Sequence, residues 1–360
     1  MSDRAPPRAA VRAVLATRAA AQRAADAIGP ADLSLFELSF AFAFSRMLGT
    51  FAELGVADVL EEPRTAEELA RKLSVNADAL HRMLRALALR GVVSIDSVGR
   101  FSLTGRGQML RSDHPQSLRP WLLYIMAPST QAAWAHLTQT VRTGEPSFPA
   151  VHGRSVWEYF SLHPDEERLF AATMRRVTEF DLPAITGGYP WPDQGTVCDV
   201  AGGVGTMLAG ILRAKPGLRG VLVDGPGVLA EAEAHLARVG VRDRVELSEG
   251  NIFSRVSAKA DFYTLKDVLH DWDDERCRTI LKTVRAAMPR GSRIVLIETL
   301  QERNTPETIA SVVDIQMLTQ CDGGRQRSVD ELHALLRSAD LTPGQVRLTA
   351  GPALVEGSAA

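Results

Sequence analysis

The second half of the chain alternates short apolar runs with longer stretches of helical spacing. The runs are rich in β-branched residues and lie at 196–200, 221–224, 245–248, 262–266 and 293–298. Such runs are typical of buried parallel strands, and the intervening segments, such as 207–213 and 227–239, have the length of helices. The pattern predicts an α/β domain with a Rossmann-like, doubly wound parallel sheet and right-handed crossovers.

Residues 31–110 show a different pattern. The stretch 33–60 has apolar residues too dense for one surface helix, which indicates helices buried in a bundle or in a dimer interface. A capping box begins the next helix at Thr65, and Asn76 begins a further helix with apolar residues at helical spacing. Two short strands follow, at 92–96 and 100–104. Helices followed by a two-stranded wing predict a mainly helical winged-helix domain.

Residues 111–190 are expected to be helical and contain three of the five tryptophans. Aromatic residues at this density fill a core or form the walls of a pocket for a flat apolar molecule. Phe170 and Met174 lie one helical turn apart, which by spacing alone predicts a packing pair. The expected division of the chain is a tail or helix, a winged-helix domain, a helical linker with a substrate pocket, and an α/β domain, at 1–30, 31–110, 111–190 and 191–360.

Composition narrows the classes of function. The net charge of −2 in 360 residues gives no electrostatic reason to expect a nucleic acid or an anionic membrane as partner. The sequence has no uninterrupted apolar run of about 18 residues, so no membrane-spanning helix is predicted. The three cysteines lie far apart, which argues against a disulfide scaffold or a zinc cluster and fits a reduced cytoplasmic protein. No His, Asp and Glu grouping has convincing metal-ligand spacing, so no metal is expected.

The candidate chemistry lies where the predicted strands end. A glycine-rich loop at 201–206 follows the first strand, and Asp224 ends the second, where a carboxylate can accept both hydroxyls of a ribose. Leu208 stands where a dinucleotide fingerprint requires its third glycine, which weakens an NAD site without excluding it. His270 follows the fourth strand, and histidine is the side chain best suited to accept a proton near neutral pH.

These motifs together resemble those of the S-adenosylmethionine-dependent O-methyltransferases of the plant caffeate and bacterial polyketide type. The most specific segments are 199–205, Asp224, 250–253, 265–272 and 323–328. The resemblance covers nearly the whole chain and implies a methyltransferase sheet preceded by a winged-helix dimerisation domain. It also implies a cytoplasmic homodimer that acts on a small hydroxylated molecule, with S-adenosylmethionine as cofactor.

The resemblance further implies roles for individual residues. The cofactor would contact Asp199, Ala201, Gly202, Gly203, Asp224, Asn251, Ile252, Phe253 and Lys266. His270 would remove the proton of the acceptor hydroxyl, and Glu298 would orient its imidazole. Gln326 stands where a second glutamate commonly supports the base. The acceptor would contact Met174, Phe170 and Asp271.

Three positions depart from the family pattern. Ala201 replaces a common glycine, and its methyl group should be tolerated if that contact is made through the backbone. Asn251 replaces a common aspartate and can accept a hydrogen bond without charge assistance. Gln326 stabilises an imidazolium less than glutamate does, so Glu298 would perform that task alone.

The sequence therefore predicts transfer of a methyl group to a hydroxyl of a small apolar secondary metabolite, with an aromatic acceptor favoured. An isoprenoid or carotenoid hydroxyl would also suit an apolar pocket. A second alternative keeps the fold and cofactor but assigns a non-methylating reaction, such as decarboxylation or hydroxylation. A third is a winged-helix DNA-binding regulator with basic residues on its second helix, which the acidic residues of 61–72 disfavour.

Overall fold

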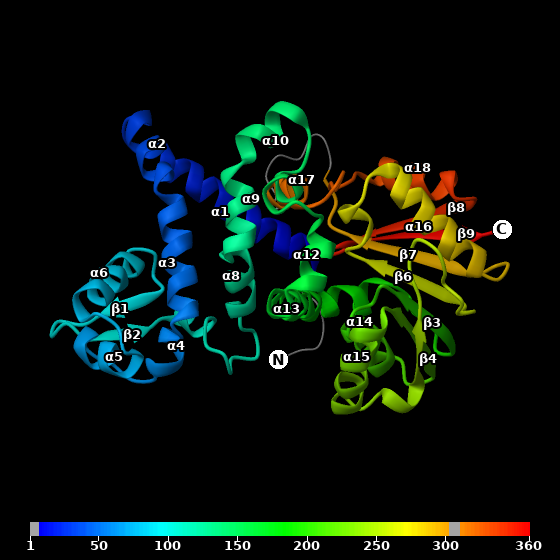
Figure 1. Cartoon of the computed structure of the whole chain (residues 1–360), viewed down its shortest axis with the longest axis horizontal. Helices are drawn as coiled ribbons and strands as arrows, with labels where there is room; N and C mark the ends of the chain where they lie inside the picture. Colours follow the sequence, from blue (N-terminus) through cyan, green and yellow to red (C-terminus); the bar gives the residue numbers. More distant parts are fainter. Residues whose placement is uncertain (1–6, 302–309) are drawn as a thin grey trace. The chain divides into compact units, whose positions relative to one another are not determined.

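The protein was analysed as a computed structural model, which describes residues 7–301 and 310–360 (Figure 1). The chain divides into two compact units. The helical unit comprises residues 20–132 and 160–176. The sheet unit comprises residues 1–19, 133–159 and 177–360, as far as they are described. The domain boundaries expected from the sequence stay a prediction.

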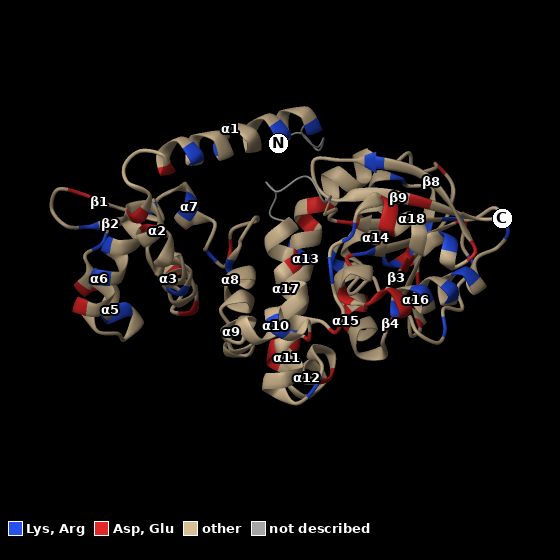
Figure 2. Ribbon diagram, turned by 90° about the horizontal axis from the view of Figure 1, so that it is seen from above, with Lys and Arg blue, Asp and Glu red and all other residues tan. Residues whose placement is uncertain are grey.

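The helical unit contains the predicted helices and wing. Its elements are α2 (Ala31–Ser39), α3 (Ala41–Glu53), α4 (Val56–Val59), α5 (Ala66–Leu73), α6 (Ala77–Ala88), β1 (Val93–Ile95), β2 (Phe101–Leu103), α7 (Gly105–Gln108) and α8 (Arg119–Ile125). Thr65 and Glu68 form the predicted capping box of α5, and the Asn76 side chain caps α6. β1 and β2 pair antiparallel, as a wing does. Acidic and basic residues are interspersed on the α5–α6 pair (Figure 2).

Helices α2 and α3 expose large apolar side chains. Leu35, Phe36, Leu38 and Phe42 are 67%, 62%, 68% and 73% exposed. Among the described helices, the stretch Ala31–Glu53 is the one with the length and composition to cross a membrane, and 17% of its most apolar window is buried. Exposed apolar side chains gathered on neighbouring helices are typical of an interaction surface.

Four helices have residues in both units. They are α1 (Arg8–Asp26), α9 (Pro128–Ala135), α12 (Val156–Leu162) and α13 (Pro164–Gly188). The sheet unit also contains α10 (Leu137–Thr143) and α11 (Ser147–His152). The expected helical character of 111–190 is therefore confirmed.

The sheet unit is built on seven strands in the order β5-β4-β3-β6-β7-β9-β8. The five predicted strands are confirmed and pair in parallel: β3 (Gly195–Val200), β4 (Leu218–Asp224), β5 (Val245–Glu249), β6 (Phe262–Lys266) and β7 (Arg293–Glu298). β8 (Leu341–Leu348) and β9 (Ala353–Ala359) are antiparallel additions at one edge. The sequence pattern did not predict these two strands, which make the sheet mixed. Pro343 and Gly344 inside β8 are typical of a turn, and the β8–β9 register shifts beside them.

Helices cover both faces of the sheet (Figure 1). On one face, α14 (Thr206–Ala214) and α15 (Pro226–Arg238) pack in a core that includes Val295. On the other, α16 (Asp274–Ala287) and α18 (Val329–Ser338) pack in a core that includes Ile294. Neighbouring residues of β7 enter opposite cores because side chains alternate along a strand. The carboxyl ends of β3, β4, β6 and β7 are left to form a site.

Candidate active site

The glycine-rich loop after β3 is anchored to the end of β4. The Asp224 carboxylate accepts hydrogen bonds from the backbone N–H of Gly203 at 2.8 Å and of Gly225 at 2.7 Å. Burial raises the pKa of Asp224, although both N–H donors act to lower it. Gly203 has φ +59° and Ala201 has φ +54°, both in the left-handed region that favours glycine. The expected tolerance of Ala201 thus comes with backbone strain at that residue.

Asp199 presents an unsatisfied oxygen under this loop. The residue is 1% exposed, and its Oδ1 accepts a hydrogen bond from the Thr264 hydroxyl at 2.9 Å. Its Oδ2 is buried and has no hydrogen-bond partner among the described residues. A Cβ on Gly202 would lie 2.6 Å from that Oδ2 atom. Burial raises the pKa of Asp199 to about 7. A buried, unpartnered acceptor beside a loop without side chains fits a ligand that brings a donor, such as an ammonium group.

The segment after β5 lies next to flat aromatic surfaces. Asn251 is exposed, and its Oδ1 accepts a hydrogen bond from the Phe253 N–H at 2.9 Å. Ile252 and Phe253 are partly buried against the core of the α16 face. The Phe253 ring meets Trp272 edge-on at 4.8 Å, and Trp272 stacks on Trp157 at 5.9 Å. These side chains are suited to flank a planar ring system such as a nucleobase.

Lys266, at the end of β6, is engaged by carboxylates. Its Nζ lies 3.1 Å from Asp181 Oδ2 on α13 and also pairs with Asp267, and its side chain is 7% exposed. Burial acts to lower the pKa of Lys266, but Asp267 and Asp181 outweigh it and raise that pKa. The ammonium is thus neutralised by the protein itself. Its backbone and aliphatic stem remain the parts that can contact a cofactor.

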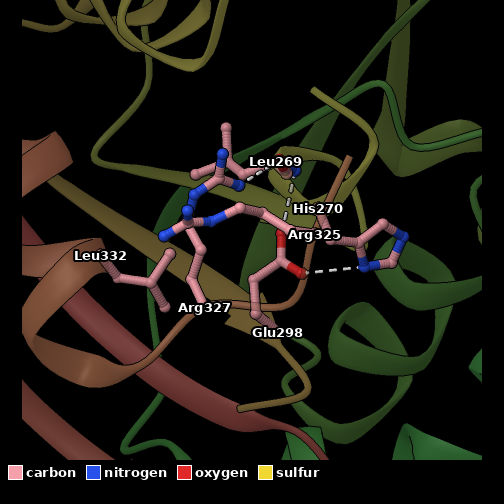
Figure 3. A pocket seen from close by; sticks show the side chains of 6 residues that line it. All are labelled: Leu269, His270, Glu298, Arg325, Arg327 and Leu332. Carbon is pink, nitrogen blue, oxygen red and sulfur yellow. Dashed lines mark hydrogen bonds and ion pairs between the residues drawn. The ribbon is translucent and has the colours of Figure 1, made fainter. Parts of the chain in front are cut away.

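His270 lies in a 3-10 turn, η2 (Leu269–Asp271), that follows β6. The register Lys266↔Ile297 places the end of β6 beside the end of β7, where Glu298 stands. His270 Nδ1 is 3.2 Å from Glu298 Oε2, an ion-pair contact that Figure 3 marks with a dashed line. This Oε2 atom makes no hydrogen bond among the described residues. The other carboxylate oxygen accepts the backbone N–H of Leu269 at 2.9 Å. The structure therefore brings together the predicted base and its predicted orienting carboxylate.

Three carboxylates act on His270, where the sequence predicted one. Asp271 Oδ1 lies 3.4 Å from Nε2. A carboxylate oxygen of Asp267, a ring nitrogen of His270 and a carboxylate oxygen of Glu298 all lie within 4.8 Å of one another. Burial acts to lower the pKa of His270, but Asp271, Glu298 and Asp267 raise it to about 10. Burial also raises the pKa of Asp271 to about 7. The imidazole is a stronger base than an exposed histidine.

Gln326 stands beside the same imidazole. Its Nε2 is 3.4 Å from His270 Nδ1, and its buried Oε1 has no hydrogen-bond partner among the described residues. Its backbone N–H is held by Asp314 Oδ1 at 2.7 Å. The amide is near enough to contact the base but brings no charge to it.

The two remaining predicted residues, Phe170 and Met174, belong to the helical unit. Phe170 packs there against Phe160 and Tyr124, with ring centroids 5.0 and 5.5 Å apart. Their assignment to the acceptor stays a prediction.

Sequence reasoning missed Asp181 and Asp267. Asp267 was inside the recognised segment 265–272, next to Lys266, and that adjacency was an available signal. Asp181 lies 85 positions before Lys266 and only the fold brings them together.

Family models match two parts of the chain. Residues 36–113 match an O-methyltransferase dimerisation domain, and residues 134–341 match an O-methyltransferase domain. The O-demethylpuromycin O-methyltransferase of Streptomyces alboniger is 36% identical over 327 residues, which are 88% of this chain and 85% of that protein.

Two further relatives bear on cofactor and reaction. An O-methyltransferase from neocarzinostatin biosynthesis, solved with S-adenosylmethionine and 2-hydroxy-5-methyl naphthoic acid, is 31% identical with a TM-score of 0.77 and covers 88% of this chain and 96% of its own. The aclacinomycin 10-hydroxylase of Streptomyces purpurascens is 32% identical over 295 residues, 81% of this chain and 79% of that protein.

Proposed function

Because the chain belongs to the O-methyltransferase family in which a dimerisation domain precedes the methyltransferase domain, we propose that it methylates a hydroxyl of a small aromatic secondary metabolite, with His270 as general base. S-adenosylmethionine is the cofactor of this family. The observation that carries the proposal is the contact of His270 Nδ1 with Glu298 Oε2, 3.2 Å apart, at the same sheet edge as the glycine-rich loop. A base held by a carboxylate is suited to deprotonate a hydroxyl.

The residues at the ends of β3, β4 and β5 fit this cofactor. The unpartnered Oδ2 of Asp199 would accept its ammonium group, and Asp224 would accept its ribose hydroxyls. Gly202 and Gly203 keep side chains out of the cradle, where Ala201 contributes backbone. Asn251, Ile252 and Phe253 would flank the adenine beside Lys266. When bound, the cofactor supplies an electrophilic methyl group on a sulfonium.

The proton then has a defined destination. Because Glu298 Oε2 lies 3.2 Å from His270 Nδ1, Nε2 would accept the proton of the acceptor hydroxyl as the O–C bond forms and the bond from the methyl group to the sulfonium sulfur breaks. A phenol has a pKa of about 10. The step requires the neutral imidazole, and because Asp271, Glu298 and Asp267 raise the pKa of His270, the fraction of protein in that form increases with pH. Asp271 Oδ1, 3.4 Å from Nε2, stabilises the imidazolium that results.

A second candidate keeps the fold and cofactor without methyl transfer. It is favoured by the relative named as a hydroxylase and by Gln326, an uncharged residue where a second glutamate is common. Asp271 and Asp267 weigh against it, because they supply the negative charge that Gln326 lacks. An isoprenoid acceptor remains an outcome of the product analysis below.

Assembly follows from the exposed apolar side chains of α2 and α3. We propose that a second copy of the chain covers them, since they fall largely inside the segment 36–113 that matches a dimerisation domain. The protein would then be a cytoplasmic homodimer, and Ala31–Glu53 would lie in the dimer and not in a membrane. The mixed charges of α5 and α6 do not favour DNA as a partner (Figure 2).

The test is the mass of the product. The protein is incubated with S-adenosylmethionine and hydroxylated aromatic acids, with 1,4-dihydroxy-2-naphthoic acid as the first probe, followed by isoprenoid alcohols. We expect a product heavier by one CH2 group and an equal amount of S-adenosylhomocysteine. A product that gains an oxygen atom, or loses CO2, would establish the second candidate instead.

A further inference from the structure

Arg327 is a buried arginine whose side chain reaches the loop that carries His270. Its guanidinium side chain is 2% exposed. Nη1 donates to the Leu269 carbonyl at 2.6 Å, and Nη2 donates to the Trp272 carbonyl at 2.7 Å. Nε and Nη2 both donate to Asp274 Oδ1, at 3.0 and 2.8 Å. One side chain therefore binds three points of the segment 269–274, on both sides of His270. Figure 3 draws Arg327 beside Leu269.

The backbone around Arg327 binds the segment that follows Glu298. The Arg327 carbonyl accepts the Gln301 N–H at 3.1 Å, and Arg327 pairs in parallel with Leu300, two residues beyond Glu298. The N–H of Arg325 donates to the His270 carbonyl at 2.8 Å. The segment 325–327 thus lies between the continuation of β7 and the His270 turn and is hydrogen-bonded to both.

Such a contact set requires arginine. A buried charge is costly unless its donors are used, and here the guanidinium is satisfied by two carbonyls and a carboxylate. The planar fork presents donors in fixed directions and so fixes the relative positions of its acceptors. A lysine at this position would keep the charge but could not reach all three acceptors at once.

We propose that Arg327 is a positioning residue for the base: its guanidinium fixes residues 269–274 so that the His270 imidazole stays against Glu298. This proposal rests on the proposed function only where it calls His270 the base of a methyl transfer. The positions of Arg327, His270 and Glu298 can be tested whatever reaction the site performs. It distinguishes Arg327 from Arg325, whose side chain is 46% exposed and pairs with Glu331 on α18.

The titration of His270 reports this geometry. The charged or polar groups around the imidazole come from its own turn, from the strand ends and from the segment 325–327: Asp267, Asp271, Glu298, Arg325, Gln326 and Arg327. Lys266 pairs with one of them, Asp267. An Arg→Lys exchange preserves the charge of this set. A change in the titration then measures a changed distance between imidazole and carboxylates and not a changed number of charges.

The experiment compares Arg327→Lys with Arg325→Lys as the matched control. Histidine is labelled at Cε1, the His270 signal is assigned by its loss in His270→Gln, and its pH titration is followed by NMR in the cofactor-free protein. We expect Arg327→Lys to lower the pKa of His270 by about one, since a looser turn weakens the contact with Glu298. The control should titrate as the wild type does. S-adenosylhomocysteine affinity, measured by calorimetry, should stay within about threefold in both variants because neither arginine side chain contacts the glycine-rich loop or Asp224.

Equal titrations in the two variants would overturn the proposal, as would a loss of thermal stability in Arg327→Lys with His270 unchanged. If Arg327→Lys does not fold, Asp274→Glu decides, because it keeps the charge and displaces the carboxylate that Arg327 binds from the exposed end. A lowered pKa of His270 in Asp274→Glu supports the proposal, and an unchanged pKa refutes it. Failure of the wild type to methylate any acceptor would refute the proposed function and leave this outcome standing.

Discussion

At the scale of single residues, His270 is governed by opposite effects. Burial favours the neutral imidazole, whereas Asp271, Glu298 and Asp267 favour the protonated form and raise its pKa to about 10. The folded-state pKa is above the unfolded value of about 6.5. Protonated His270 therefore stabilises the fold below pH 6.5, and this contribution is lost as the pH rises toward 10.

We predict that Glu298→Gln lowers the pKa of His270 by at least about one, because it removes one of the charges that raise it. NMR titration of the labelled imidazole measures the change. Glu275→Gln, at an exposed glutamate of α16, is the control and should leave the titration unaltered. A wild-type His270 that titrates near 6.5 would show that the carboxylates do not act as described.

A second residue-scale prediction concerns Ala201, whose φ of +54° is strained for a residue with a Cβ. Ala201→Gly should raise the free energy of unfolding by about 1 kcal/mol, since glycine adopts this conformation without the clash. Ala230→Gly, an exposed position in α15, should lower it by about 1 kcal/mol because glycine disfavours helix. Urea unfolding of both variants checks the opposite signs. Destabilisation by Ala201→Gly would contradict the strain.

At the scale of elements, the regular alternation of strand and helix was predictable from the sequence. The two antiparallel strands at the edge of the sheet, β8 and β9, were not. β3, β4, β6 and β7 are largely buried on both faces, so their apolar runs were visible in the sequence. β8 contains Pro343 and Gly344 and lies at the edge, where the antiparallel partner tolerates them, so it was not recognised as a strand. His270, Glu298 and the glycine-rich loop were predictable because each follows such a run.

The contacts that tune the site were not predictable from sequence. Asp181 reaches Lys266 from α13, and Arg327 reaches Leu269 from a segment 58 positions later. Each pairing depends on how elements pack, and a single sequence contains no signal of packing. Arg327 was inside the recognised segment 323–328, but nothing in that segment indicated which side chain turns inward.

The ion pair between Asp181 of α13 and Lys266 of β6 leads to a prediction about the contact between these two elements. Burial raises the pKa of Asp181 to about 6, although Lys266 acts to lower it. The folded protein thus binds this proton more tightly than the unfolded chain, whose aspartate titrates at about 3.9. The stabilising contribution of Asp181 is present below pH 4 and is lost as the pH rises through 6.

Asp181→Asn should therefore flatten the dependence of stability on pH. Between pH 4 and pH 7, the free energy of unfolding of the wild type should fall relative to that of the variant by about 2 kcal/mol. Asp193→Asn, which breaks an exposed ion pair with Lys215, is the control and should follow the pH dependence of the wild type closely. Parallel pH curves for wild type and Asp181→Asn would contradict the burial of this carboxyl.

At the scale of the whole molecule, the exposed apolar surface of α2 and α3 predicts the assembly. Phe42→Asp places a charge on that surface and should convert a dimer to a monomer by sedimentation, since burying an unpaired charge is costly. Leu348→Asp, on the edge strand β8, is the control and should remain dimeric. A wild-type protein that sediments as a monomer at micromolar concentration would refute the homodimer.

We have proposed that this protein transfers a methyl group with His270 as the base. The direct measurement is transfer of labelled methyl from S-adenosylmethionine to a hydroxylated aromatic acceptor by the wild type and by His270→Ala, with S-adenosylhomocysteine affinity measured in parallel. We expect a loss of at least about 100-fold in turnover with cofactor affinity within about threefold of the wild type. Undiminished turnover by His270→Ala, with the cofactor bound, would contradict it.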